Sequence, residues 1–236
     1  MTEPTAASVP VSGHDLFTEH ECAGLRDRVL DSRSHWITRG LQFYTLGAAS
    51  YLDAAVNREQ YATAATRLNP VLARDFADVY ARLVDFFQGL LRQPVSVDGD
   101  LALPGFHVFE FTGGYRDPLQ IAERAHFDLQ WALLRPAGQA PQTMSFTVPI
   151  ELPSGGGAMQ LWNARYRELV RADVAAREYA RVHGSRRLSY SVGQTVLHDG
   201  LILHAIGESL TSRPHGQRIT LQGHLMREGD AWVMYW

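Results

Sequence analysis

The segment RITLQGHL at 218–225 alternates polar and apolar side chains with a period of two. In a β-strand, this period places the polar side chains on one face and the apolar ones on the other. The polar face would hold Arg218, Thr220, Gln222 and His224, and the apolar face Ile219, Leu221 and Leu225. Burying the polar face is costly unless a ligand satisfies its hydrogen bonds. The segment therefore favours a strand in the wall of a barrel or jelly roll whose interior binds a polar ligand.

Helical patterns occupy the first part of the chain. A capping box of Thr18 and Glu21 predicts a helix over 18–31, and apolar residues spaced by three and four predict two more helices. The second is expected over 53–68, and a third is expected to begin at Asn69-Pro70 and to end at Gln93-Pro94. These three helices precede any strong strand pattern.

Short β-type runs separated by Gly and Pro fill most of the chain from residue 95 onward. A polar, Arg-rich stretch over 163–183 interrupts them and predicts a helical insertion. The fold class is therefore mostly β with flanking helices (α+β), a double-stranded β-helix or jelly roll with the N-terminal helices packed outside. The expected divisions are a flexible tail at 1–13 and a single domain at 14–236, with helical support at 14–94 and a jelly-roll core at 95–236.

The composition excludes several kinds of site and partner. All 22 basic residues are Arg, so there is no lysine for a Schiff base or a P-loop, and a fixed cation for an acidic ligand must be Arg. The single cysteine, Cys22, excludes an internal disulfide, a zinc finger and a Cys-ligated iron–sulfur cluster. The net charge of −3 and the lack of a long apolar run predict neither nucleic acid nor a membrane as partner. Because no signal-peptide pattern is present, we expect a cytoplasmic protein with a small-molecule ligand.

Five polar residues in the second half of the chain could carry chemistry. His126 and Asp128 are two residues apart, so on a strand the imidazole and the carboxylate would point to the same side. The segment that leads to His204 is typical of a strand, a turn and a second strand. An arginine followed two residues later by a hydroxyl, as in Arg218 and Thr220, can hold a carboxylate through the guanidinium fork and one further hydrogen bond.

The order His126-x-Asp128, His204, Arg218-x-Thr220 resembles the Fe(II)/2-oxoglutarate-dependent oxygenase superfamily, in its prolyl-4-hydroxylase-like or phytanoyl-CoA-hydroxylase-like branch. The similarity extends from residue 15 to the end of the sequence. It implies that His126, Asp128 and His204 hold Fe(II), and that Arg218 and Thr220 bind the far carboxylate of the co-substrate 2-oxoglutarate. Three protein ligands leave adjacent metal positions for a bidentate oxo-acid and O₂.

The resemblance also implies an enzyme, a dioxygenase that hydroxylates an unactivated C–H bond of an amino acid or a natural-product-type metabolite and decarboxylates 2-oxoglutarate to succinate. Asp128 favours hydroxylation, because related halogenases have a small residue in its place. Where prolyl hydroxylases have a tyrosine that helps to hold the co-substrate, the nearest residue is Phe111, so the contacts of the second carboxylate stay open. The residues expected to bind substrate are Tyr115, Arg116, Gln130, Trp131 and Arg165.

Other interpretations of the same residues stay open. His198 precedes Arg218 as His204 does, but it looks like part of the turn before the distal histidine, so we expect it at the rim or beside the ligands. His107 and His224 are expected to be satisfied by polar neighbours. The metal residues would also suit a cupin-type dioxygenase or isomerase that does not use 2-oxoglutarate. In a non-catalytic jelly-roll binding module, their arrangement would be coincidental.

Overall fold

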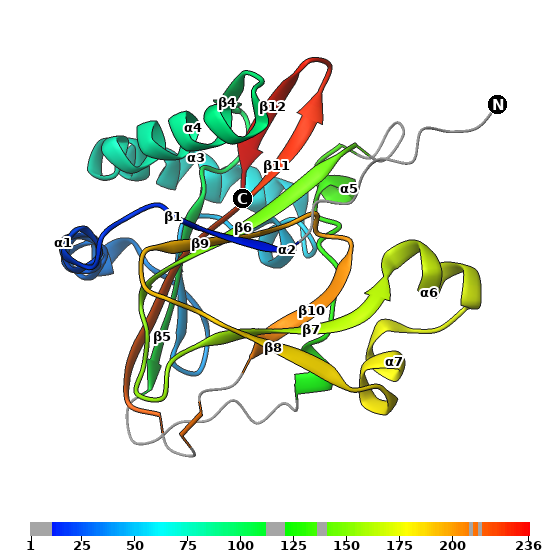
Figure 1. Cartoon of the computed structure of the whole chain (residues 1–236). Coiled ribbons are helices and arrows are strands. Elements are labelled where there is room, and N and C mark those ends of the chain that lie inside the picture. The colour runs from blue at the N-terminus through cyan, green and yellow to red at the C-terminus, as the bar shows by residue number, and fades with distance from the viewer. Residues whose placement is uncertain (1–10, 112–120, 136–140, 208–209, 212–213) are drawn as a thin grey trace.

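The computed structural model describes residues 11–111, 121–135, 141–207, 210–211 and 214–236 (Figure 1). The helices are α1 (Glu19–Asp31), α2 (Ser50–Asp53), α3 (Arg58–Asp75), α4 (Ala77–Leu91), α5 (Trp131–Leu134), α6 (Tyr166–Ala172) and α7 (Ala176–Val182), with the 3₁₀ helices η1 (Ser32–His35) and η3 (Ile121–Arg124). The strands are β1 (Ser12–Asp15), β2 (Ile37–Gly40), β3 (Phe43–Leu46), β4 (Val95–Val97), β5 (Gly105–Phe111), β6 (Thr143–Glu151), β7 (Ala158–Arg165), β8 (Ser185–Ser189), β9 (Gln194–His198), β10 (Ile202–Gly207), β11 (Gly216–Glu228) and β12 (Ala231–Tyr235). Within these ranges, no helix combines the length and the apolar character that crossing a membrane requires.

Nine of these strands form a large sheet with the order β1-β9-β6-β11-β5-β3-β2, and β12 and β4 extend it beside the second half of β11. The 13-residue β11 pairs with β5 on one side and with β6 on the other. On its outer face, Ile219, Leu221 and Leu225 are fully buried in one core cluster with residues of α1, α3 and α4. The predicted alternation is confirmed, and the N-terminal helices cover the outside of the sheet (Figure 1).

A second, antiparallel sheet, with the order β10-β7-β8, lies across the interior from the large one (Figure 1). Side chains of both sheets line one cavity, for example Met159 and Ile206 from the small sheet and Thr147 and Gln222 from the large one. Two facing sheets with helices outside are the predicted jelly roll, so the fold class is confirmed.

The helical insertion differs from the single helix predicted over 163–183. β7 continues through Arg165, and two short helices, α6 and α7, follow it. Asp173 adopts a left-handed conformation with φ of 55° and ends α6. Leu169 of α6 and Ala180 of α7 pack into one small apolar cluster, so burial of both helices against the small sheet favours the broken arrangement.

The third helix does not begin at Asn69-Pro70, which is also a correction. Pro70 lies inside α3, and the break between α3 and α4 falls at Phe76. The Asn69 side chain does not cap a helix, because it donates to the carbonyl of Leu101 (2.8 Å) and accepts from the N–H of Leu103 (3.0 Å). These contacts fix α3 to the chain before β5 and hold the helix in spite of the hydrogen bond that proline cannot make.

The N-terminal segment is ordered from an earlier residue than predicted. Ser12 and Gly13 fall within the expected tail, yet they belong to β1 and pair with Leu197 and Val196 of β9. At the edge of the sheet, the main-chain groups of β9 form hydrogen bonds with β1, which adds one more strand to the sheet. Residues 1–10 lie outside the described part of the chain.

Candidate metal centre

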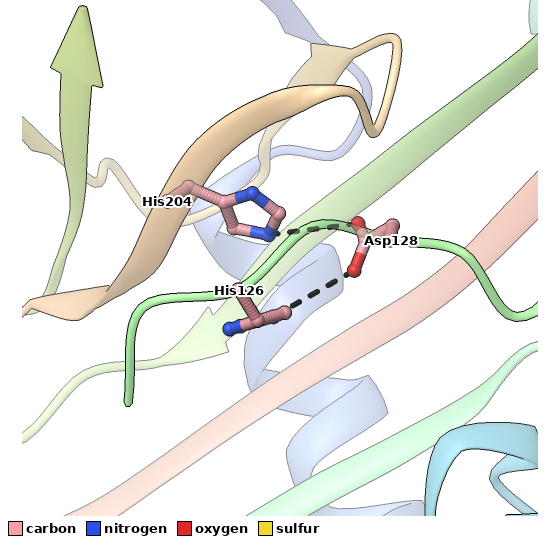
Figure 2. Close-up of side chains that lie close together, drawn as sticks. All are labelled: His126, Asp128 and His204. Atoms are coloured by element: carbon pink, nitrogen blue, oxygen red, sulfur yellow. Dashed lines mark ion pairs between the residues drawn. The ribbon is translucent and has the colours of Figure 1, made fainter. Parts of the chain in front are cut away.

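Main-chain hydrogen bonds bring His126, Asp128 and His204 together (Figure 2). His126 and His204 are antiparallel bridge partners, and the N–H of each donates to the carbonyl of the other, at 2.9 and 3.1 Å. The N–H of Asp128 donates to the carbonyl of Gly200 (2.8 Å), in the turn between β9 and β10. His126 and Asp128 therefore lie on a segment joined to β10 by a single bridge, and not on the regular strand that their spacing predicts.

The three side chains point toward a common centre. Each offers one potential ligand atom within 4.8 Å of the other two. His126 Nε2 lies 3.6 Å from Asp128 Oδ1, and His204 Nε2 lies 3.5 Å from Asp128 Oδ2 (Figure 2). Asp128 and His204 are buried, whereas the side chain of His126 is 48% exposed. Two imidazoles and one carboxylate suit a divalent transition metal such as Fe(II).

The protonation states of these groups also suit a cation. Burial acts to raise the pKa of Asp128, but interactions with His204, His224, His126 and His198 outweigh it and hold that pKa well below its usual value. Burial lowers the pKa of His204 to about 3. At neutral pH, Asp128 is therefore a carboxylate and His204 a neutral imidazole, which are the forms that bind a metal.

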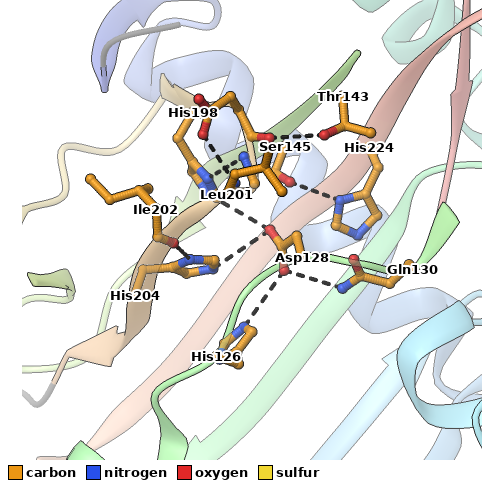
Figure 3. Close-up of polar contacts among 12 residues, drawn as sticks. His126, Asp128, Gln130, Thr143, Ser145, His198, Leu201, Ile202, His204 and His224 are labelled. Carbon is orange, nitrogen blue, oxygen red and sulfur yellow. Dashed lines mark hydrogen bonds and ion pairs between the residues drawn. The ribbon is translucent and has the colours of Figure 1, made fainter. Parts of the chain in front are cut away.

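The hydrogen bonds of the imidazole rings distinguish His204 from His198 as a possible ligand. The Nδ1 atoms of His126 and His204 donate to main-chain carbonyls two residues earlier (2.6 and 2.9 Å), which leaves a free lone pair on each Nε2. His198 has the opposite tautomer, because its Nδ1 accepts from the N–H of Gly200 (3.1 Å) and its Nε2 carries the proton. The buried Nε2–H of His198 lies 3.9 Å from Asp128 Oδ2 (Figure 3), so His198 neighbours the carboxylate and offers no lone pair there.

A cavity of about 110 Å³ adjoins the three side chains between the two sheets. Near Asp128 its wall is polar: Gln130 Nε2 donates to Asp128 Oδ1 (3.1 Å), and the Ser145 hydroxyl bonds to His224 Nδ1 (3.0 Å) (Figure 3). The remaining polar residues of the wall include Tyr51, His107, Thr147, Tyr190 and Gln222. The prediction that His224 is satisfied by a polar neighbour is confirmed.

Arg218 is buried beside the cavity, next to Tyr190. Its side chain is 4% exposed, and none of its three guanidinium nitrogens makes a hydrogen bond of good geometry to any residue in the described ranges. The guanidinium lies between the rings of Phe109 and Tyr190, with Cζ 5.6 and 5.8 Å from their centroids, and Tyr190 lines the cavity. Burial lowers the pKa of Arg218, and Tyr190 opposes that shift. A buried guanidinium with three open donors is well suited to a carboxylate.

The other residues predicted to bind ligands lie in different surroundings. Thr220 is fully buried and accepts a hydrogen bond from Gln222 (3.2 Å). Gln130 lines the cavity, whereas Trp131 packs against a separate apolar cluster. Arg165 forms an ion pair with Asp199. Tyr115 and Arg116 lie outside the described residues.

The structure adds cavity residues that the sequence did not reveal. Ser145 and Thr147 alternate with apolar residues along β6, so the period of two could have identified them as inward-facing. Tyr51 and Tyr190 carry no comparable signal, because neither belongs to a regular amphipathic segment. His107 meets its expected polar neighbour through Nε2 alone: that neighbour is Tyr51, 56 residues earlier in the chain, and Nδ1 has no partner among the described residues.

Comparisons with known proteins show which solved structures have a similar architecture. No protein-family model and no curated protein matches the sequence. A similar solved structure is an N-substituted L-amino acid dioxygenase from Burkholderia ambifaria AMMD in complex with alpha-KG, with 18% identity and a TM-score of 0.54 over 94% of this chain and 84% of that one. The alpha-ketoglutarate-dependent epimerase SnoN from nogalamycin biosynthesis has 14% identity and a TM-score of 0.50, over 92% and 80% of the two chains.

EctD from S. alaskensis, solved with 2-oxoglutarate and 5-hydroxyectoine, has 16% identity and a TM-score of 0.50, over 91% of this chain and 71% of that one. At such identities the likeness concerns the fold. The resemblance predicted from the sequence is confirmed at that level, and the chain has the jelly-roll fold of the 2-oxoglutarate-dependent oxygenases.

Proposed function

We propose that this protein is an Fe(II)/2-oxoglutarate-dependent dioxygenase that hydroxylates an unactivated C–H bond of a small molecule. The observation that carries the proposal is a combination within one jelly roll: the cluster of His126, Asp128 and His204, and the buried guanidinium of Arg218 with three open donors. A metal cluster alone would suit many enzymes, and a buried arginine alone would suit many anions. Together they suit a diacid that binds a metal at one end and a guanidinium at the other.

In this proposal, His126, Asp128 and His204 hold Fe(II), and Arg218 with Thr220 holds the far carboxylate of 2-oxoglutarate. When bound, the iron and the co-substrate supply the oxidising chemistry with O₂, in which 2-oxoglutarate is decarboxylated to succinate. Gln130 keeps Asp128 oriented through its amide. The charges of a divalent metal, Asp128, the dianionic oxo-acid and Arg218 cancel, which suits an interior where an unbalanced charge is costly.

The proposed substrate is an amino acid or a natural-product-type metabolite. The volume of about 110 Å³ and the polar wall support a small ligand. The Burkholderia structure, by its name, is a dioxygenase of N-substituted L-amino acids, and SnoN belongs to nogalamycin biosynthesis. The position of Gln130 in the cavity wall supports a contact with such a substrate, and Tyr115, Arg116, Trp131 and Arg165 stay as predicted contacts. Action in the cytoplasm, without a nucleic-acid or membrane partner, belongs to the same proposal.

The test is 2-oxoglutarate turnover. The protein is loaded with Fe(II) under anaerobic conditions, mixed with 2-oxoglutarate and a panel of amino acids and small metabolites, and then exposed to air while succinate is measured. We expect succinate formation that one class of compounds stimulates and that an Asp128→Ala variant abolishes. Metal binding without succinate would favour a cupin-type enzyme that does not use 2-oxoglutarate, and the absence of metal binding would favour a binding module.

A further inference from the structure

Tyr51 of α2 and the buried His107 of β5 form a polar pair in the cavity wall. The Tyr51 hydroxyl lies 2.5 Å from His107 Nε2, and the two rings meet edge to face, with centroids 5.8 Å apart. His107 is 3% exposed, and its Nδ1 has no hydrogen-bond partner among the described residues. The rings of Phe43, Phe109 and Trp236 surround it. The pair therefore holds one unsatisfied nitrogen in an aromatic environment.

The unsatisfied nitrogen indicates where the protons of this pair lie. Burial lowers the pKa of His107 well below its usual value, so the ring is neutral and carries one N–H. If that N–H were on Nδ1, it would be a buried donor without an acceptor, which is rarer in proteins than an unsatisfied acceptor. With the N–H on Nε2, it donates to the Tyr51 oxygen. The hydroxyl hydrogen of Tyr51 is then free to donate elsewhere.

A buried ion pair holds the helix that carries Tyr51. Arg39 binds Asp53, the last residue of α2, through two hydrogen bonds of 2.6 Å. Asp53 also accepts from the N–H of Ala49 (2.9 Å), the residue that precedes α2. Arg39 and Asp53 are 9% and 2% exposed, so the pair is held in the interior. These contacts hold both ends of α2, the four-residue helix that carries Tyr51.

Tyr51 is near the two charged groups of the proposed site. Tyr51 lines the same cavity as Asp128 and as Tyr190, the neighbour of Arg218. Burial is the largest influence on the pKa of Tyr51 and raises it, against a smaller lowering by Arg39, so the hydroxyl stays protonated. A protonated hydroxyl therefore belongs to the wall of the cavity that the three side chains of the metal cluster also line. We propose that the Tyr51 hydroxyl, oriented by His107, donates a hydrogen bond to an oxygen of the bound oxo-acid. This inference rests on the proposed function and assigns a further binding residue to it.

The experiment measures 2-oxoglutarate binding to the Mn(II)-loaded protein by titration calorimetry, without turnover. We expect Tyr51→Phe to weaken 2-oxoglutarate binding by about tenfold, the lower end for a hydrogen bond to a charged group, and to leave Mn(II) affinity unchanged. The matched control is Tyr80→Phe, because the buried Tyr80 hydroxyl donates to the carbonyl of Pro104 (2.7 Å) and is not part of the cavity wall.

Two further variants test the role of His107 without changing Tyr51. His107→Gln keeps an N–H close to the position of Nε2, so we expect near-normal 2-oxoglutarate affinity. His107→Leu removes that donor and should weaken binding as Tyr51→Phe does. Equal 2-oxoglutarate affinity in wild type and Tyr51→Phe would overturn the inference and leave the proposed function standing. If the Mn(II)-loaded wild type did not bind 2-oxoglutarate at all, both would be overturned.

Discussion

Replacing Arg218 by methionine should stabilise the ligand-free protein and weaken the binding of 2-oxoglutarate, the proposed co-substrate. Arg218 is 4% exposed, and its guanidinium has no hydrogen-bond partner of good geometry among the described residues. A buried charge without a partner costs several kcal/mol of folding free energy. The flanking rings of Phe109 and Tyr190 return part of this cost, at about 1 kcal/mol each. Methionine has a similar length and no charge to desolvate.

We therefore expect Arg218→Met to raise the unfolding free energy of the ligand-free protein by about 1–3 kcal/mol, or the Tm by about 2–12 °C for a chain of this size. The same change removes a charge-assisted pair of about 1.5–3 kcal/mol, so 2-oxoglutarate should bind about 10- to 100-fold more weakly. At 100 times its Kd, 2-oxoglutarate should stabilise the metal-loaded wild type by about 2.7 kcal/mol and the variant by much less.

The assay is thermal unfolding of wild type and variant, with and without Mn(II) and 2-oxoglutarate. Arg227→Met is the control, because Arg227 lies on the same strand and its donors reach Gly229 (3.0 Å) and Gln142 (3.0 Å). It should lower the Tm slightly and leave 2-oxoglutarate affinity unchanged. A lower Tm for Arg218→Met in the ligand-free protein, together with normal 2-oxoglutarate affinity, would refute the reasoning.

Three other predictions concern the metal cluster, the buried His198 and the Arg39–Asp53 pair. His204→Ala removes one of three proposed ligands and should lower Mn(II) affinity by more than about 100-fold in calorimetry, since weaker supporting contacts alone contribute 10–100-fold. Burial lowers the pKa of His198 from its ordinary value of 6.5 to about 4. The neutral imidazole therefore contributes fully to the stability of the metal-free protein above pH 6.5, and this contribution is lost as the pH falls toward 4. The unfolding free energy should fall by about 1.4 kcal/mol per pH unit for this group, and a Tm that stays constant from pH 7 to 5 would contradict it. Asp53→Asn breaks a buried ion pair with Arg39 and should cost about 3–5 kcal/mol, measured by thermal unfolding, whereas the exposed Asp27→Asn should change little.

The fold and the residues of the site were predictable where the signal is local. The period of two along β11 predicts both the buried Ile219 and Leu221 and the inward-facing Arg218, because side-chain direction in a strand depends only on position. The spacing of His126 and Asp128 likewise predicts that the two side chains face one centre. Their meeting with His204, however, is produced by a main-chain bridge between distant segments.

The remaining features depend on contacts that no local pattern encodes. Tyr51 belongs to a helix of four residues and meets His107 only because α2 lies against β5. Pro70 ordinarily marks a helix boundary, but tertiary contacts of the neighbouring Asn69 favour a continuous helix. The ion pair of Arg165 with Asp199 likewise joins residues 34 positions apart, and no local pattern around Arg165 indicates it. In each case the nearest partner in space is far away in sequence.

The bridge between His126 and His204 fixes the spacing of the two residues at the main chain. Residues that exchange both main-chain hydrogen bonds across two antiparallel segments are held about 5.5 Å apart at Cα whether or not an ion is present. If this is the metal site that we propose, the main chain of two of its ligands is already in place, so we expect cation binding to order little polypeptide. We then expect divalent ions of similar radius to exchange without refolding, in an order set by the preferences of nitrogen and oxygen donors.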